Sequence, residues 1–207
     1  MILGGTRILK SAFQSTTLRT AGFYSVPQNE LTSVSKLLAV CLMFVGGSPA
    51  STAGGIKTVT LGVIMLLVIS YVKGEQELNI FNRRISNAAI NRAIVVISIS
   101  IFIIITATGL LMISENFESE KNMDVQHSEI VNLSIHDIVF EVVSAYATVG
   151  LTLGITSKLT ITGKIIIIIL MIIGRLGPIT MSIALFKKHN EIKQPKAKYP
   201  YGNVLIG

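Results

Sequence analysis

Residues 46–58 read GGSPASTAGGIKT, and this stretch interrupts a long apolar region that covers residues 37–72. As one straight helix that region would reach about 54 Å, well beyond the ~30 Å hydrocarbon core of a bilayer. Four glycines and a proline within the interruption remove the preference for helix. We therefore predict a helix at about residues 31–45, an irregular intramembrane loop, and a second helix at about residues 56–73.

The composition of the chain is typical of a membrane protein. Half of its 207 residues are hydrophobic and 14% are charged, whereas soluble domains carry roughly 25% charged residues. A net charge of +7 can indicate a nucleic-acid partner, but here the basic residues cluster at the ends of apolar stretches instead of alternating with aromatic side chains. The expected partner is therefore a membrane, and no nucleic acid is expected.

Two apolar stretches are long enough to cross a bilayer. Residues 93–113 contain no charge, follow three arginines and precede several acidic residues, so the positive-inside rule places the start of this helix in the cytoplasm. Residues 164–187 form the second predicted span, which ends at two lysines and therefore returns to the cytoplasm. We expect a multi-pass protein of the plasma membrane with a cytoplasmic C-terminus.

The segment between these spans need not cross the bilayer. Residues 135–146 are too short to span and are followed by ATVGL at residues 147–151, which predicts a re-entrant helix that dips in from outside and returns as extended chain. Such backbone is tolerated at membrane depth only where protein or water covers it. This arrangement indicates a pore lining.

The chain aligns with itself at a shift of 128 residues. This offset produces eight identities, including Thr20 with Thr148 and Gly22 with Gly150, and predicts two units of outer helix, re-entrant helix, Gly-containing segment and inner helix. In the first unit the re-entrant helix is predicted at residues 11–19. Only about ten residues precede it, so this unit is expected to lack its outer helix and the sequence to be truncated.

The Gly-containing segments are predicted to form an ion-selectivity filter. Rings of backbone carbonyls can replace the hydration shell of an ion, and glycine permits the backbone angles that turn successive carbonyls toward one axis. A Gly-containing turn at the membrane surface is the alternative for either segment alone, but two copies at one repeat phase favour a filter. The candidate filter residues are Thr20, Ala21, Gly22, Phe23, Thr148, Val149, Gly150 and Leu151.

A gate is predicted below this filter. Arg175 lies midway along the second predicted span, where an arginine costs at least about 2.5–3.5 kcal/mol unless it faces a cavity or a partner. We expect it to pair with carbonyls of the residue 46–57 loop and to oppose ion passage until the loop moves; a static helix break is the alternative for that loop. The candidate gate residues are Gly46, Gly47, Ser48, Gly54, Gly55, Lys57 and Arg175.

Other kinds of site find little support in the sequence. The loop is not a phosphate cradle, because Ile56 separates Gly55 from Lys57. Histidines 127, 136 and 189 fall in predicted loops or the tail without matching ligands, so no enzyme activity and no cofactor are expected. Arg19 is predicted to brace the first re-entrant helix through hydrogen bonds to filter backbone.

Five motifs together resemble the Ktr/Trk/HKT superfamily of potassium uptake proteins. Residues 13–23, FQSTTLRTAGF, resemble its third pore helix and filter, and residues 46–58 resemble its intramembrane gating loop. The fourth filter and the arginine-bearing inner helix are matched by ATVGLT at residues 147–152 and GRLGP at residues 174–178. The ending YPYGNVLIG, residues 199–207, is similar to that of Ktr-type membrane subunits.

The resemblance implies an all-α membrane protein built from tandem helix–pore loop–helix repeats, with re-entrant pore helices and a broken inner helix. Residues 1–80 would supply the third repeat from its pore helix, residues 81–188 the complete fourth repeat, and residues 189–207 a cytoplasmic tail. Glycine instead of serine at positions 22 and 150 would favour potassium over sodium. Bound K⁺ would lie at the backbone carbonyls of Thr20, Ala21, Gly22, Thr148, Val149 and Gly150.

The resemblance also implies a function and partners. The chain would be the C-terminal half of a potassium uptake subunit, with K⁺ as the transported ion and Na⁺ as a candidate coupling ion. The full-length subunit would form a homodimer controlled by a cytosolic nucleotide-binding regulatory ring. The alternative is a truncated, non-conducting fragment or assembly partner that inserts and dimerises but moves no ion.

Overall fold

A computed structural model describes residues 2–49, 51–74, 79–80, 83–121 and 134–177 of the chain. Its elements, in order, are α1 (Ile2–Thr17), the 3-10 helix η1 (Gln28–Glu30), α2 (Ser33–Phe44), α3 (Thr58–Val72), β1 (Asn79–Ile80), β2 (Arg83–Arg84), α4 (Asn87–Lys121), α5 (Ile135–Tyr146) and α6 (Ile161–Leu176). The described part is helical except for β1 and β2, a two-residue antiparallel pair between α3 and α4. The described part therefore agrees with the predicted all-α fold class.

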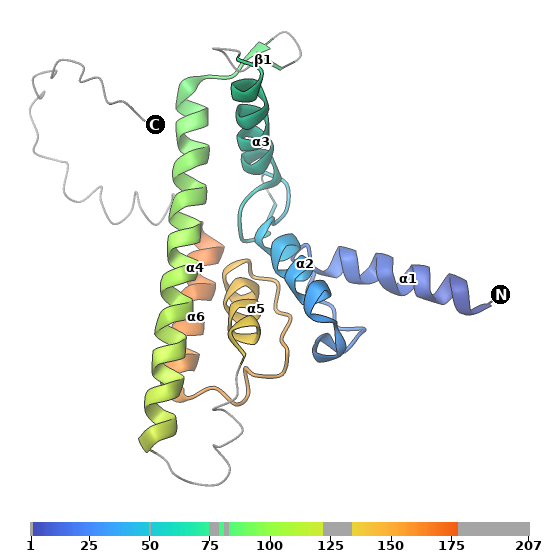
Figure 1. The fold of residues 1–207 in the computed structure, drawn as a ribbon, viewed down its shortest axis with the longest axis vertical. Coiled ribbons are helices and arrows are strands. Elements are labelled where there is room, and N and C mark those ends of the chain that lie inside the picture. Colours follow the sequence, from blue (N-terminus) through green and yellow to red (C-terminus); the bar gives the residue numbers. More distant parts are fainter. Residues whose placement is uncertain (1, 50, 75–78, 81–82, 122–133, 178–207) are drawn as a thin grey trace, which may run out of the picture.

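The 35-residue helix α4 is the long axis of the fold. Helix α3 packs beside one half of it, while α5 and α6 pack against the other half (Figure 1). Helix α2 packs on α5, and α1 projects away from the other helices. As a result, the segments that follow α1 and α5 and the loop between α2 and α3 are gathered near the middle of the molecule.

Helix α5 is the most enclosed element in the described part of the chain. Eight of its 12 residues are buried, so it contacts protein on nearly every side. Its face toward α4 and α6 contributes to one apolar cluster: Ala107, Leu111, Ile138, Val142, Ala145, Tyr146, Leu159, Ile167 and Leu170. Its other face contributes to a second: Leu18, Ala39, Met43, Phe140, Val143, Ala147, Val149 and Leu151. Fully burying one such side chain stabilises the fold by about 1.5–3 kcal/mol, so α5 is a rigid support for the chain that follows it.

Several predicted helices are confirmed. The predicted span at residues 93–113 lies inside α4, the helices on either side of the broken region appear as α2 and α3, and α5 has the bounds predicted from the sequence. By length and composition, residues Asn87–Asn116 form the one described helix able to cross a bilayer, while α2 and α3 are shorter apolar helices.

Two predicted helices have different bounds in the structure. The first re-entrant helix, predicted at residues 11–19, begins at Ile2 and ends at Thr17, because no proline stops helix upstream. The second span, predicted at residues 164–187, is wrong as one unbroken helix. Helix α6 ends at Leu176, where Gly177 takes a φ of 80° before a proline; residues 178–187 lie outside the described residues.

Candidate ion pathway

The segments that follow α1 and α5 bend in the same unusual way. Thr20 and Thr148 have φ values of 64° and 55°, and Gly22 and Gly150 have φ values of 73° and 85°. The two threonines are the only described non-glycine residues with positive φ, a conformation that costs an L-residue roughly 1–2 kcal/mol. Strain of this kind persists where the surrounding structure enforces it and clusters at functional sites.

The two segments lie against each other. A Cβ atom added at Gly22 would overlap the carbonyl oxygen of Val149. Position 22 thus requires glycine for two reasons, because its φ is left-handed and because no space remains for a side chain. The predicted filter segments of the two units are therefore direct neighbours, although 126 residues lie between Gly22 and Val149 in the sequence.

Six backbone carbonyls in these segments have no hydrogen-bond donor within the described part of the chain. The carbonyl oxygens of residues 20–22 and 148–150 accept no hydrogen bond from any described residue. The next carbonyl is engaged in both segments, because Thr17 Oγ1 donates to Phe23 O at 2.7 Å and Ser144 Oγ donates to Leu151 O at 2.6 Å. Backbone carbonyls without a protein donor are groups that a dehydrated cation can satisfy.

The hydroxyl donors Thr17 and Ser144 were not predicted, and the role given to Arg19 was wrong. The Arg19 side chain is exposed and makes no hydrogen bond with a described residue. Short hydroxyl side chains instead tie the helix ends to the filter segments. The available signal was a Thr or Ser three or four residues before each filter threonine.

The residue 46–57 loop closes on its own ends. Val45 and Ile56 form a parallel bridge, in which Gly46 N donates to Ile56 O at 2.9 Å and Ile56 N donates to Phe44 O at 3.1 Å. A Cβ atom at Gly46 would overlap the carbonyl oxygen of Gly54. The loop is therefore a compact unit with a defined conformation.

Lys57 holds this loop together from within. Its ammonium group donates to the carbonyl oxygens of Ala53 at 2.6 Å and Ser51 at 3.1 Å. Ser51 Oγ in turn donates to Ser48 O at 2.6 Å. The Lys57 ammonium group is thus the donor that pairs with these two loop carbonyls.

The loop rests directly on the second filter segment. Gly54 N donates to Thr148 Oγ1 at 3.1 Å, and a Cβ atom added at Gly54 would lie 2.6 Å from that oxygen and 2.7 Å from the carbonyl oxygen of Ala147. At Gly55 an added Cβ atom would lie 3.3 Å from Ala147 Cβ. The predicted gate and the predicted filter are in contact.

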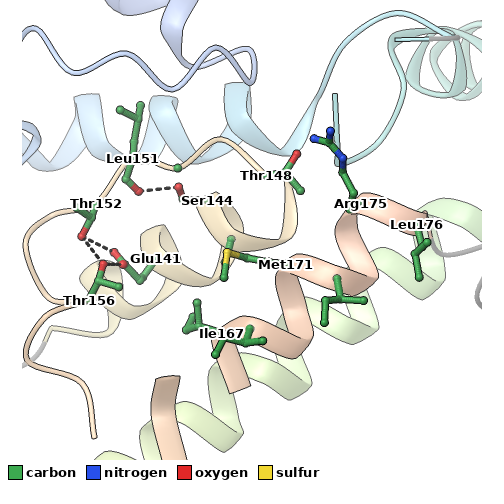
Figure 2. Close-up of a pocket in the computed structure, with 14 residues that line it drawn as sticks. Glu141, Ser144, Thr148, Leu151, Thr152, Thr156, Ile167, Met171, Arg175 and Leu176 are labelled. Atoms are coloured by element: carbon green, nitrogen blue, oxygen red, sulfur yellow. Dashed lines mark hydrogen bonds between the residues drawn. The ribbon is translucent and has the colours of Figure 1, made fainter. Parts of the chain in front are cut away.

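Arg175 lies beside this contact, in the last turn of α6. The preceding Gly174 is packed so tightly that an added Cβ atom would overlap the carbonyl oxygen of Tyr146, at the end of α5. Arg175 and Thr148 line the same cavity of about 640 Å³ (Figure 2). The arginine is exposed, and the predicted pairing with loop carbonyls is absent among the described residues.

One ion pair joins the two units. Lys36 Nζ, on α2, lies 3.3 Å from Asp137 Oδ1, on α5. Both side chains are partly exposed, and such pairs contribute about 0.2–1 kcal/mol, so the contact orients the units more than it stabilises them. His136 lies in the first turn of α5 instead of a loop, and the described residues include no group of three side chains suited to a metal.

The sequence of the chain is similar to those of known cation transport proteins. The model of the TrkH family, described as cation transport protein, matches residues 1–196. The chain is 35% identical to the potassium/sodium uptake protein NtpJ of Enterococcus hirae over 97% of its own length and 42% of that protein. It is 38% identical to the Ktr system potassium uptake protein B of Bacillus subtilis, over 97% of its length and 41% of that protein. The chain thus spans about two fifths of the length of these relatives, and it belongs to the TrkH family of membrane cation transport proteins.

Proposed function

We propose that the chain contributes two of the filter segments through which potassium enters the cell across the plasma membrane. The observation that carries this proposal is the pair of matching segments. They have left-handed threonine and glycine residues, six carbonyls that no described residue hydrogen-bonds, and direct contact between Gly22 and Val149. Each segment follows the C-terminal end of a helix, whose dipole favours a cation there. K⁺ is the proposed cargo, held at the carbonyls of residues 20–22 and 148–150.

The gate of this pathway is proposed to be the residue 46–57 loop together with Arg175. The hydrogen bond from Gly54 to Thr148 supports this role, because any cation leaving the second filter segment would meet the loop. Arg175 lines the cavity next to Thr148, where its charge repels a cation. The loop must move aside for ions to pass, and its glycines allow that movement.

The remaining parts of the assignment rest on the family. A multi-pass arrangement with a cytoplasmic C-terminus, tandem repeats around one pathway, a homodimer and a cytosolic regulatory ring are proposed for the protein that contains this chain. The names of two relatives support part of this assignment: one is called a Ktr system protein, and the other is named for both potassium and sodium. The latter name supports Na⁺ as a candidate coupling ion.

Growth of a potassium-uptake-deficient bacterial strain on limiting K⁺ tests the proposal. The chain is expressed alone and fused behind the part of the Bacillus subtilis relative that it does not match. We expect the fusion to restore growth, Gly22→Ala to abolish it, and Gly109→Ala to preserve it, because Gly109 sits in a helix with open space around its Cα. No growth with the well-inserted fusion, or equal growth with Gly22→Ala, would refute the transport assignment.

A further inference from the structure

In the second unit, two hydrogen-bonded rungs join α5 to the chain that returns from the filter. The inner rung is the bond from Ser144 Oγ to Leu151 O. The outer rung centres on Glu141, whose carboxylate accepts a hydrogen bond from Thr152 Oγ1 at 3.0 Å and another from Thr156 Oγ1 (Figure 2). Glu141 and Ser144 are three residues apart and so share one face of the helix.

The first unit has the same two rungs made from different residues. Its inner rung is the bond from Thr17 Oγ1 to Phe23 O, and its outer rung is the bond from Gln14 Nε2 to Gln28 Oε1 at 2.6 Å. Gln28 is completely buried and also donates to Val26 O. Gln14 and Thr17 are again three residues apart on their helix.

The position of these rungs ties them to the filter. In each unit they close a loop of chain that contains the left-handed threonine and glycine and the three unpaired carbonyls. Glu141 is only 5% exposed, yet it lines the same cavity as Thr148 and Gly150. Ser144 holds the backbone of Leu151, and Glu141 holds Thr152 and Thr156 just beyond it, so the outer rung fixes the direction in which the chain leaves the filter.

We propose that Glu141 is a positioning and specificity-determining residue, which sets the spacing of the second set of filter carbonyls through its hydrogen bonds to Thr152 and Thr156. This inference rests on the proposed potassium transport. The essential property of Glu141 is the geometry of its hydrogen bonds and not its negative charge, because the equivalent rung of the first unit consists of two neutral amides. Gln14 has the same role for the first set.

The test compares K⁺ and Na⁺ flux through the transport-competent protein that contains this chain. Glu141→Ala removes the rung, and we expect it to lower the K⁺/Na⁺ flux ratio by about tenfold, the factor that one hydrogen bond to a charged group contributes. Glu141→Gln retains an acceptor of the same shape and should keep the ratio within about twofold of wild type. Glu30→Gln is the control for loss of an acidic charge, because the Glu30 side chain is exposed and makes no hydrogen bond with a described residue.

Variants of the partner residues make the test independent of any folding defect in Glu141→Ala. Thr156→Val should lower the flux ratio in the same direction, Thr156→Ser should preserve it, and Gln14→Leu should lower it through the first unit. Amide hydrogen exchange of residues 151–156 should accelerate in Glu141→Ala and Thr156→Val but not in Glu141→Gln.

The results separate this inference from the proposed function. If Glu141→Ala transports K⁺ with an unchanged flux ratio, or if Glu141→Gln is as damaging as Glu141→Ala, the positioning role is overturned while transport stands. If the wild-type protein moves neither ion, the proposed function fails, and the specificity role of Glu141 fails with it.

Discussion

Replacing Lys57 by methionine should open the proposed gate. Methionine keeps the length of the side chain but removes the ammonium group that donates to Ser51 O and Ala53 O. A hydrogen bond to a charged group contributes about 1.5–3 kcal/mol; because Lys57 is only half-buried, we take about 1.5 kcal/mol for the two bonds together. That loss shifts the balance between the compact loop and displaced forms by about tenfold.

The assay is uptake of a potassium tracer into proteoliposomes, with the amount of inserted protein measured in the same samples. We expect Lys57→Met to raise the initial rate severalfold, up to the ceiling set by the filter itself. Lys164→Met is the matched control, because the Lys164 side chain is exposed and its ammonium group makes no hydrogen bond with a described residue. Equal or slower uptake by Lys57→Met, at wild-type insertion, would show that the compact loop does not obstruct the pathway.

Three further substitutions test neighbouring contacts. Arg175→Ala should raise the same tracer uptake by removing a positive charge from the cavity beside the filter; unchanged uptake would remove Arg175 from the gate. Gly174→Ala should lower the yield of folded protein in detergent, because its Cβ atom would overlap Tyr146 O, whereas Gly109→Ala should not; equal yields would contradict the packing of α6 on α5. Tyr146→Phe should cost only about 0.5–1.5 kcal/mol of unfolding free energy, because Ser100, the partner that it loses, still donates to Val96 O; a much larger loss in a denaturation curve would mean that the hydroxyl has another role.

The broken inner helix was predictable because the composition changes sharply at both of its ends. Glycines and a proline separate the two apolar helices α2 and α3. A threonine also caps the N-terminus of α2 and of α6: Ser35 N donates to Thr32 Oγ1, and Gly163 N donates to Thr160 Oγ1. The two threonines are 128 residues apart, so the repeat offset found in the sequence also relates the helix caps. Local chemistry of this kind is visible without a structure.

The rungs were not predictable from the ungapped alignment. Thr17 lies three positions before Thr20, but Ser144 lies four positions before Thr148. The helix residues of the two units therefore correspond at an offset of 127 and the filter residues at 128. The alignment therefore pairs Gln14 with an apolar residue and hides its equivalence to Glu141. Only the hydrogen-bond geometry reveals the one-residue difference.

The end of α6 was not predicted, because hydropathy does not register the effect of a Gly-Pro pair on the backbone. The apolar run continues past residue 177, which suggested one long span, whereas a left-handed glycine before a proline ends α6 one residue after Arg175. The arginine thus belongs to a helix end beside the filter. Its long side chain has several possible directions, and no sequence pattern selects among them.

Anomalous diffraction from rubidium bound to the transport-competent protein would show whether the six carbonyls of the filter segments hold the transported ion. Rubidium has nearly the size of potassium and scatters strongly enough to be placed. We expect ions within coordination distance of the carbonyl oxygens of residues 20–22 and 148–150, and we expect these ions to be lost in Gly22→Ala. Rubidium bound elsewhere in a transporting protein, with these six carbonyls unoccupied, would contradict the proposed filter.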